Sequence, residues 1–301
     1  MLISKIREEI IEKIKTLPIK IKGAAIYGSI ARRAQKKESD IDLLIVSDTI
    51  NPRRNKRGKE IAAIKEWFSL DFPMDILLLT TNECLSNFRN HNPLFLDIAW
   101  EGIILWDEDD FLKSMIEETR AYISEKKIRK LDDGWVFPVP DRTSILLSNV
   151  SNKDFAMAMF KDGERDFEIG LNILEDGYFD KSVYHFQQSL EKAVKAILIC
   201  FGIFKKTHFV GEILVKELEA RELNNGWKKK LLQVARASSE IEPEVTWSRY
   251  PGIDEDALWI PYEEYTSDDA KEIKEKCEKA IGITKKFLKW WFSPKPSTEN
   301  T

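Results

Sequence analysis

The stretch YGSIARRAQKKESDIDLLIV, residues 27–46, joins a Gly-Ser turn to a basic run and then to two aspartates at the head of an apolar segment. In a strand, the side chains of residues i and i+2 point to the same face. If residues 39–46 form a strand, Asp40 and Asp42 project side by side while the apolar residues between and after them face the other way. Two adjacent like charges repel each other, and they become favourable when a hard cation such as Mg²⁺ lies between them.

A third carboxylate follows in FPMDILLLT, where Asp75 heads another apolar run that can pair alongside the first. Three carboxylates on neighbouring strands can hold two metal ions for in-line displacement at phosphorus. The sequence therefore predicts a metal site made of Asp40, Asp42 and Asp75.

The turn before the aspartates predicts a phosphate site. Gly28 lets the backbone turn tightly, and we expect Ser29 to cap a short helix that begins near Ala31. The free N–H groups at a helix N-terminus favour a phosphate. Arg32 and Arg33 would add positive charge there.

Composition limits the remaining possibilities. The chain has 301 residues, a net charge of −4 and 43% hydrophobic residues, which indicates about two globular domains and argues against a protein that coats nucleic acid. No apolar run approaches the roughly 18 residues of a membrane span. The three cysteines are far apart, so we expect no disulfide framework or zinc site and place the chain in the cytoplasm.

The pattern along the chain changes once. Short apolar runs alternate with helical stretches up to about residue 110, which predicts an α+β domain with a mixed sheet and flanking helices. Residues 111–150 are expected to connect this domain to an all-α bundle over residues 151–292, and residues 293–301 to form a flexible tail. A basic loop, NPRRNKRGKE at residues 51–60, could be a solvated loop or could bind phosphate or RNA.

The first constellation resembles the nucleotidyltransferase superfamily related to DNA polymerase β, in particular its minimal branch. The resemblance covers about residues 20–107. It implies that Gly28 and Ser29 hold the triphosphate, that Asp40 and Asp42 bind Mg²⁺, and that Asp75 is the third carboxylate. Arg33 departs from the pattern, since many relatives have glycine there.

A second resemblance covers about residues 153–292. HFQQSLEKAVKAIL, a Thr-His turn and SRYPG are similar to the HEPN family (higher eukaryote and prokaryote nucleotide-binding). This resemblance implies a helical bundle, commonly dimeric and found beside minimal nucleotidyltransferases in toxin–antitoxin pairs. The bundle residues His185, Gln188, Lys192, Arg249 and Tyr250 could form a nucleotide or partner surface. Alternatively, the residues on the helix could form an ordinary exposed or packing face, and Tyr250 could only end a helix. His208 is expected to cap a helix.

The ribonuclease members of that family use an arginine followed after four to six residues by histidine, and this sequence lacks such a pair. The leading hypothesis is therefore an enzyme that moves a nucleoside monophosphate, AMP from ATP, to a hydroxyl of a protein, RNA or small molecule with two Mg²⁺ ions. A non-catalytic nucleotide sensor is the alternative, and an RNA-cleaving toxin comes third. The helical half would then position the acceptor, bind nucleotide or form a homodimer.

Overall fold

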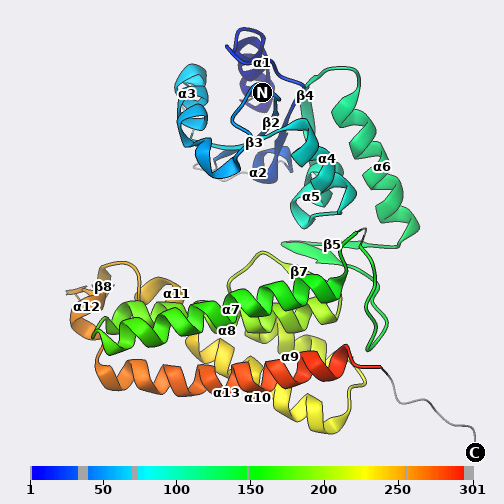
Figure 1. Ribbon diagram of the computed structural model, residues 1–301. Coiled ribbons are helices and arrows are strands. Elements are labelled where there is room, and N and C mark those ends of the chain that lie inside the picture. The colour runs from blue at the N-terminus through cyan, green and yellow to red at the C-terminus, as the bar shows by residue number, and fades with distance from the viewer. Residues whose placement is uncertain (1, 33–39, 70–72, 148, 255, 295–301) are drawn as a thin grey trace, which may run out of the picture. The chain divides into compact units, whose positions relative to one another are not determined.

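The computed structural model describes residues 2–32, 40–69, 73–147, 149–254 and 256–294, and the chain divides into two compact units, Met1–Ile128 and Arg129–Thr301. Each unit has its own arrangement of helices and strands (Figure 1). No helix in the described part of the chain combines the length and apolarity that a bilayer span needs.

The first unit is built on a four-stranded mixed sheet in the order β3-β2-β1-β4. β1 pairs antiparallel with both β2 and β4, whereas β2 and β3 run parallel. The apolar runs that carry Asp42 and Asp75 form the neighbouring strands β2 and β3 of this sheet, and the alternation of strands with helices confirms the expected α+β class. The elements are α1 (Leu2–Lys15), β1 (Gly23–Tyr27), α2 (Gly28–Ala31), β2 (Ile41–Val46), the 3-10 turn η1 (Arg54–Lys56), α3 (Gly58–Phe68), β3 (Met74–Leu79), α4 (Thr81–Arg89), α5 (Pro93–Glu101), β4 (Ile103–Asp107) and α6 (Phe111–Glu125).

The sheet is buried on both faces because successive strand residues alternate between two apolar clusters. Ile41, Leu43 and Ile45 of β2 pack with α1 and α3, while Leu44 and Val46 pack with α4, α5 and α6. By the same alternation, Asp42 belongs to the face that carries α4 to α6.

The first unit reaches Ile128, beyond the boundary expected near residue 110. Leu112 and Ile116 of α6 are buried in the cluster shared by β1, α4 and α5. Helix α6 is therefore part of this unit, although the sequence suggests a connecting segment.

The second unit is a helical bundle with short strands at its edges. Its elements are β5 (Arg129–Leu131), β6 (Gly134–Val136), α7 (Asn152–Glu175), α8 (Phe179–Cys200), β7 (Ile203–Lys205), α9 (Gly211–Ala220), α10 (Asn225–Ile241), α11 (Glu244–Trp247), β8 (Gly252–Asp254), β9 (Ala257–Trp259), α12 (Pro261–Glu264) and α13 (Ser267–Trp291). Helix α8 packs against α7, α10 and α13 and is buried on most sides. The small sheet β5-β6-β7 and the hairpin β8-β9 are additions to the expected all-α bundle.

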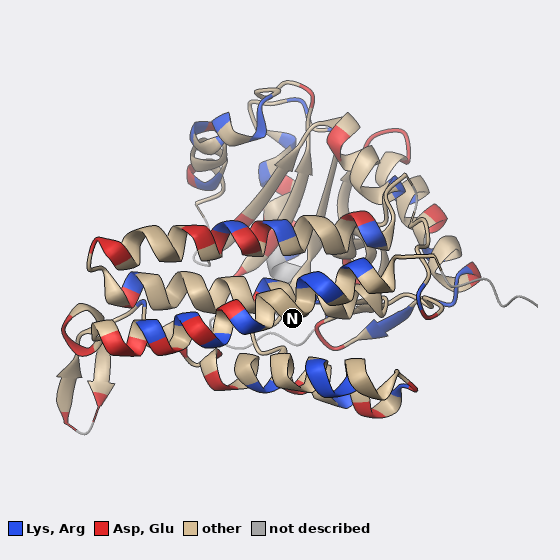
Figure 2. Ribbon diagram, turned by 60° about the horizontal axis from the view of Figure 1, so that its bottom comes forward, with Lys and Arg blue, Asp and Glu red and all other residues tan. Residues whose placement is uncertain are grey.

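Acidic and basic residues are interspersed along the long helices of the bundle (Figure 2). Some of these residues form ion pairs between neighbouring helices, as Lys192 of α8 does with Asp162 of α7 and Lys285 of α13 with Glu164 of α7. This mixture of charges agrees with the net charge of −4.

The basic loop at residues 51–60 contains a structural arginine. The Arg57 side chain is 1% exposed, and it donates to Glu83 Oε2 at 2.6 Å, to Leu78 O at 2.9 Å and to Asn51 O at 2.7 Å. Arg57 thereby ties the loop to the end of β3 and to the first turn of α4, where Glu83 also completes a capping box with Thr80. The ion pair with Glu83 therefore gives Arg57 a structural role, and no bound phosphate or RNA is needed to account for this basic residue.

We expect Arg57→Met to lower the free energy of unfolding of the first unit by about 3 kcal/mol, because it leaves Glu83 and several carbonyl groups without their donor. Hydrogen exchange of the β2 and β3 amides measures the effect. The control Arg54→Met removes an exposed arginine from the same loop and should change the value by less than about 0.5 kcal/mol. Equal effects of the two substitutions would contradict the assignment.

The difference in the free energy of unfolding between wild type and Arg57→Met depends on pH because of Glu83. Burial raises the pKa of Glu83, but hydrogen bonds from Arg57 and Thr80 outweigh it and leave that pKa below its ordinary value of 4.5. The ionised carboxylate therefore stabilises the fold fully above that ordinary value, and this contribution is lost as the pH falls through the lowered pKa. The stability gap between wild type and Arg57→Met should accordingly narrow in acid.

Candidate functional site

The parallel pairing of β2 and β3 brings two of the three predicted carboxylates together. Asp42 is the register partner of Asp75, so both side chains leave neighbouring strands, about 4.8 Å apart, on the same face of the sheet. Asp42 is half-buried and Asp75 is exposed. Asp40 lies just before β2 and is exposed as well.

Gly28 lies at the turn from β1 into α2, and this turn is in close contact with Asp42. Its φ of +74° lies in the left-handed region, and a β carbon at this position would come within 2.0 Å of Asp42 Oδ2. Only glycine fits here without displacing the carboxylate. The turn and the aspartate pair therefore form one site.

Helix α2 begins at Gly28 itself and packs against β1, β2 and α5. Ser29 is thus inside the helix, and the capping position belongs to Tyr27, whose side chain makes no capping hydrogen bond. The expectation that Ser29 caps a helix starting near Ala31 is wrong, because the left-handed Gly28 lets the helix start directly at the strand end. Ser29 remains in the first turn, two residues from Tyr27, which is the register partner of Asp42.

Tyr27 is a member of the site that the sequence interpretation missed, although it directly precedes Gly28. Burial raises the pKa of the Tyr27 phenol, and the negative charges of Asp42 and Asp75 raise it further. The phenol therefore stays protonated at neutral pH and can donate a hydrogen bond beside the carboxylates.

The donor set suits a magnesium ion that is shared with a substrate. Within the described residues, no three His, Cys, Asp or Glu side chains gather into one ligand group. Mg²⁺ commonly takes one or two carboxylates together with phosphate oxygens and water, which is the set that Asp42 and Asp75 offer. The chemistry of the residues therefore fits the ion when a phosphate completes its coordination.

Of the two arginines expected to bind phosphate, one is described. Arg32 Nη1 lies 2.7 Å from Glu101 Oε1 at the end of α5, and this glutamate is largely buried. The ion pair fixes Arg32 against α5, so a phosphate would have to share its guanidinium with Glu101. Arg33 lies outside the described residues, as does the rest of the basic run up to residue 39.

In the bundle, two of the predicted surface residues share one ion-pair network between α7 and α8. His185 Nδ1 lies 3.2 Å from Asp166 Oδ1, and Lys192 Nζ lies 2.6 Å from Asp166 Oδ2 and 2.5 Å from Asp162 Oδ2. Burial lowers the pKa of Lys192, but its hydrogen bonds to the two aspartates outweigh that effect and raise the pKa overall.

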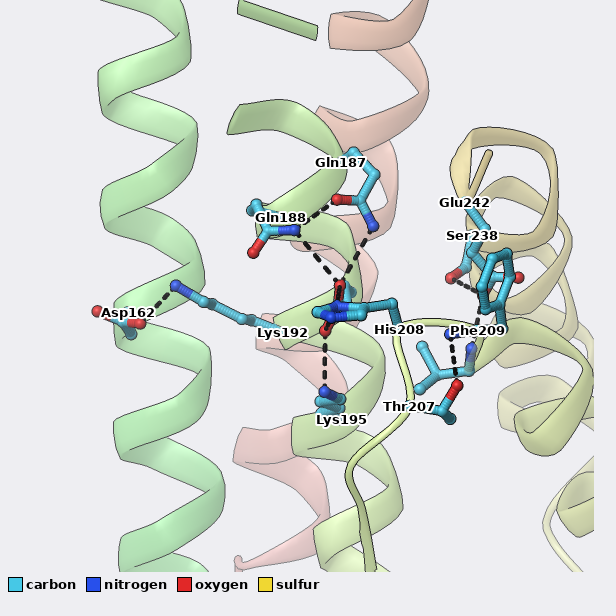
Figure 3. Close-up of polar contacts among 12 residues, drawn as sticks. Asp162, Gln187, Gln188, Lys192, Lys195, Thr207, His208, Phe209, Ser238 and Glu242 are labelled. Atoms are coloured by element: carbon cyan, nitrogen blue, oxygen red, sulfur yellow. Dashed lines mark hydrogen bonds and ion pairs between the residues drawn. The ribbon is translucent and has the colours of Figure 1, made fainter. Parts of the chain in front are cut away.

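Gln188 belongs to a second network, in which Glu191 of α8 is the shared acceptor. Gln187, Gln188, Lys195 and His208 of this network are labelled in Figure 3. The Glu191 side chain is 5% exposed, and it accepts hydrogen bonds from Gln187 at 3.2 Å and from Lys195 at 2.8 Å, while Gln188 donates to Gln187 at 2.6 Å. His208 Nδ1 lies 3.0 Å from the same carboxylate. These contacts fasten the Thr-His turn to the central helix.

The capping role expected for His208 is wrong. Helix α9 begins at Gly211, and its first N–H groups, those of Val210 and Gly211, donate to Glu242 Oε1 at 2.7 and 2.6 Å. Glu242 follows α10, far along the chain, and no local signal in the sequence points to it. A buried carboxylate from another helix therefore does what a local cap would do.

Arg249 and Tyr250 form a separate exposed group. The Arg249 guanidinium carbon lies 4.8 Å from the ring centroid of Tyr250 and 5.1 Å from that of Tyr184, next to His185 on α8. Such stacking holds a cation over aromatic faces. The structure thus brings the predicted bundle residues into three neighbouring groups along α8 and not into one cluster.

Known proteins match both halves of the chain. Residues 3–100 match the model of a nucleotidyltransferase domain, and residues 156–292 match the model of a HEPN domain. These matches confirm both resemblances seen in the sequence.

Two relatives come from Methanocaldococcus jannaschii. One, provisionally named toxin MJ1304, is 36% identical over 138 residues, which cover 46% of this chain and 91% of the relative. The other, provisionally named protein adenylyltransferase MJ1305, is 26% identical over 116 residues, which cover 38% of this chain and 79% of the relative.

Among solved structures, the archaeal HEPN homologue ST0689 aligns with 27% identity and a TM-score of 0.34, over 44% of this chain and 97% of that chain. The chain belongs to the HEPN family, and its HEPN domain follows a nucleotidyltransferase domain in the same polypeptide.

Proposed function

We propose that this nucleotidyltransferase moves a nucleoside monophosphate, AMP from ATP, to a hydroxyl group of an acceptor and releases pyrophosphate with the help of Mg²⁺. The observation that carries the proposal is the in-register pair of Asp42 and Asp75 against the Gly28 turn. Two carboxylates on one sheet face repel each other unless a cation is shared between them. The adjacent turn offers backbone N–H groups to the phosphates that would bring this cation.

A protein is the acceptor that we favour. The name of the relative matched at 26% identity, protein adenylyltransferase, supports ATP as the donor and a protein as the acceptor. An RNA end and a small hydroxylated molecule are the alternatives. We place the reaction in the cytoplasm, because the three cysteines are all buried and unpaired.

In the proposed reaction, the carboxylates and the Gly28 turn have different roles. Asp42 and Asp75 would hold the metal, and Asp40 would join them from the start of β2. The backbone of Gly28 and Ser29 would bind the β- and γ-phosphates. When bound, Mg²⁺ would neutralise the charge that develops on the phosphates and on the leaving pyrophosphate.

The exposed Asp75 is suited to receive the proton of the acceptor hydroxyl. In this step the acceptor oxygen forms a bond to the α-phosphorus, and the bond from that phosphorus to the bridging oxygen of the β-phosphate breaks. The bridging oxygen keeps the electron pair and leaves with pyrophosphate. Positioning and charge stabilisation supply most of the catalysis in such a transfer.

The bundle residues His185, Gln188, Lys192, Arg249 and Tyr250 enter the proposal as a surface for the nucleotide or a protein partner. Arg249 and Tyr250 are exposed and stacked, which suits contact with a base or an aromatic side chain.

The test is an incubation of the full chain with Mg²⁺ and each nucleoside triphosphate, in which pyrophosphate release and intact protein mass are followed. Release with ATP and the addition of one nucleotidyl group to a protein support the proposal. Binding of ATP without release, even with cell lysate and RNA as acceptors, would instead indicate a nucleotide sensor. Metal-independent RNA cleavage that survives the loss of Asp42 would indicate a ribonuclease.

Asp42→Asn should lower the rate of pyrophosphate release at least ~10²-fold, because it removes a carboxylate that would hold the metal ion that neutralises the phosphates. Asp48→Asn is a matched control. Asp48 lies just after the C-terminal end of β2, away from Asp42, and it accepts hydrogen bonds from Thr81 N at 2.8 Å and Thr81 Oγ1 at 2.7 Å. This control should keep the wild-type rate, and an equal loss in both variants would argue against the site.

Gly28→Ala should also lower the rate by about 10²-fold, since the new methyl group must displace Asp42 Oδ2 or the turn by more than 1 Å. Gly58→Ala is its control, because a β carbon at Gly58 meets no atom within 4 Å. Thermal unfolding of both variants separates a shifted site from a lost fold. Full activity of Gly28→Ala would show that the turn and Asp42 need not be in contact.

A further inference from the structure

An open groove lies between the first half of α7 and the end of α13, two helices that pack against each other. It has a volume of about 630 Å³, which is in the range of sites that bury a small ligand. The apolar side chains that line it are those of Met157, Ala158, Phe160, Leu288 and Phe292. Met157 is 44% exposed, so part of this apolar surface is open to solvent. Apolar surface gathered in a groove is typical of a site that a ligand covers.

Four lysines border this apolar surface, and we call the site the lysine groove. On α7, Lys153, Met157 and Lys161 follow one another at intervals of four residues. On α13, Lys285 and Lys289 are also four residues apart. Residues at this spacing share one face of a helix, so each helix brings lysines and apolar side chains to the groove together.

The lining of the lysine groove has an excess of positive charge. Among the described residues that line it, four are lysines and one, Glu164, is acidic, which gives a net charge of +3 on a chain whose total is −4. Glu164 is paired with Lys285 at 2.8 Å. The other three lysines are exposed and form no ion pair with a residue in the described ranges; they are Lys153, Lys161 and Lys289.

The nearby aspartates of α7 are engaged with other partners. Asp154 accepts a hydrogen bond from Ser151 Oγ at 2.7 Å and completes the capping box of the helix. Asp162 lies 2.5 Å from Lys192 of α8. These contacts hold the start of α7 and join the helix to α8. The three unpaired lysines of the groove are therefore available to an anionic ligand.

The length of the groove suits a single extended chain. Its lining residues on α7 run from Lys153 to Glu164, which is about 16 Å at ~1.5 Å per residue. A zigzag chain of about twelve carbons joined by bonds of ~1.5 Å has a similar length. The methylene stems of the lysines add apolar contact at the rim while their ammonium groups stay in water. A chain on the floor can thus place a charged end among the lysines.

We infer that the lysine groove binds an amphipathic anion, the phosphate monoester of a single apolar chain. The chain lies along the apolar floor, and the phosphate meets lysines that α7 and α13 bring to the rim. Burial of methylene groups supplies the affinity, and the lysine charges select the sign of the head group. A phosphate monoester carries close to two negative charges at neutral pH, so it can be shared between two lysines. The site belongs to the second unit and does not depend on the proposed catalysis.

The test is a calorimetric titration of the full chain, without nucleotide, with dodecyl phosphate below the concentration at which it forms micelles. One molecule should bind per chain. Decyl phosphate, which is two methylenes shorter, should bind about tenfold more weakly. Dodecyltrimethylammonium has the same chain and the opposite charge, and it should bind at least about tenfold more weakly. Inorganic phosphate alone should show no binding, because it lacks the chain.

Substitutions on the two helices locate the site. Lys289→Glu should weaken the binding of dodecyl phosphate about tenfold or more by reversing a charge at the rim. Lys286→Glu is its matched control and should keep the wild-type affinity within about twofold, since Lys286 is exposed on the same helix and does not line the groove. Met157→Asp should weaken binding about tenfold or more by placing a charge on the apolar floor. Its control is Phe209→Asp, because Phe209 is 56% exposed and lies outside the groove.

Thermal unfolding of each variant shows that it is folded. The inference is overturned if dodecyl phosphate does not bind, if the cationic probe binds equally well, or if Lys289→Glu and Lys286→Glu have the same effect. Adsorption to vesicles of anionic lipid, without binding of monomeric dodecyl phosphate, would overturn it in favour of a membrane surface. A lower mass of the Lys289→Glu chain than of wild type, measured by light scattering, would overturn it in favour of a second copy that covers the groove.

Discussion

The register between β2 and β3 is the constraint on which the first unit depends. Because Ile41 pairs with Met74, Asp42 falls opposite Asp75, and a slip of β3 by one residue would turn Asp75 towards the apolar cluster under α1 and α3. The burial of both sheet faces therefore fixes the site as well as the fold. Gly28 completes it, since only a residue without a side chain lets the turn lie against Asp42.

In the second unit, the buried side chain of Glu191 is the contact that holds several segments together. A buried carboxylate is costly unless donors surround it, and here Gln187, Lys195 and His208 do so. The contact with His208 anchors the turn that leads into α9, so the polar residues of the HFQQSLEKAVKAIL stretch have a structural role. The Asp166 network with His185 and Lys192 similarly joins α7 to α8.

The sequence alone predicts the strands, the helical half and the Asp42 and Asp75 positions, because these depend on local periodicity and on a short motif. It fails where the deciding contact is distant along the chain. The cap of α9 comes from Glu242, whereas the local pattern suggests His208. Arg57 is buried against β3, whereas the local pattern suggests a solvated loop. Helix α6 joins the first unit through packing that composition does not reveal. Tyr27 was missed because only the pairing of β1 with β2 places it beside Asp42.

Asp42 and Asp75, the proposed metal-binding pair, differ from the aspartates that stabilise the fold. Asp48, Asp154 and Asp269 each accept hydrogen bonds from a hydroxyl and a backbone N–H group, which lower the pKa of each of these carboxyls. Each stabilises a turn or a helix start. Asp42 and Asp75 instead face each other across two strands, and their combined charge raises the pKa of Tyr27, which adds to the effect of burial. Such a concentration of negative charge does little for the stability of the sheet, and we propose that it serves to bind a cation together with the phosphates of a nucleotide.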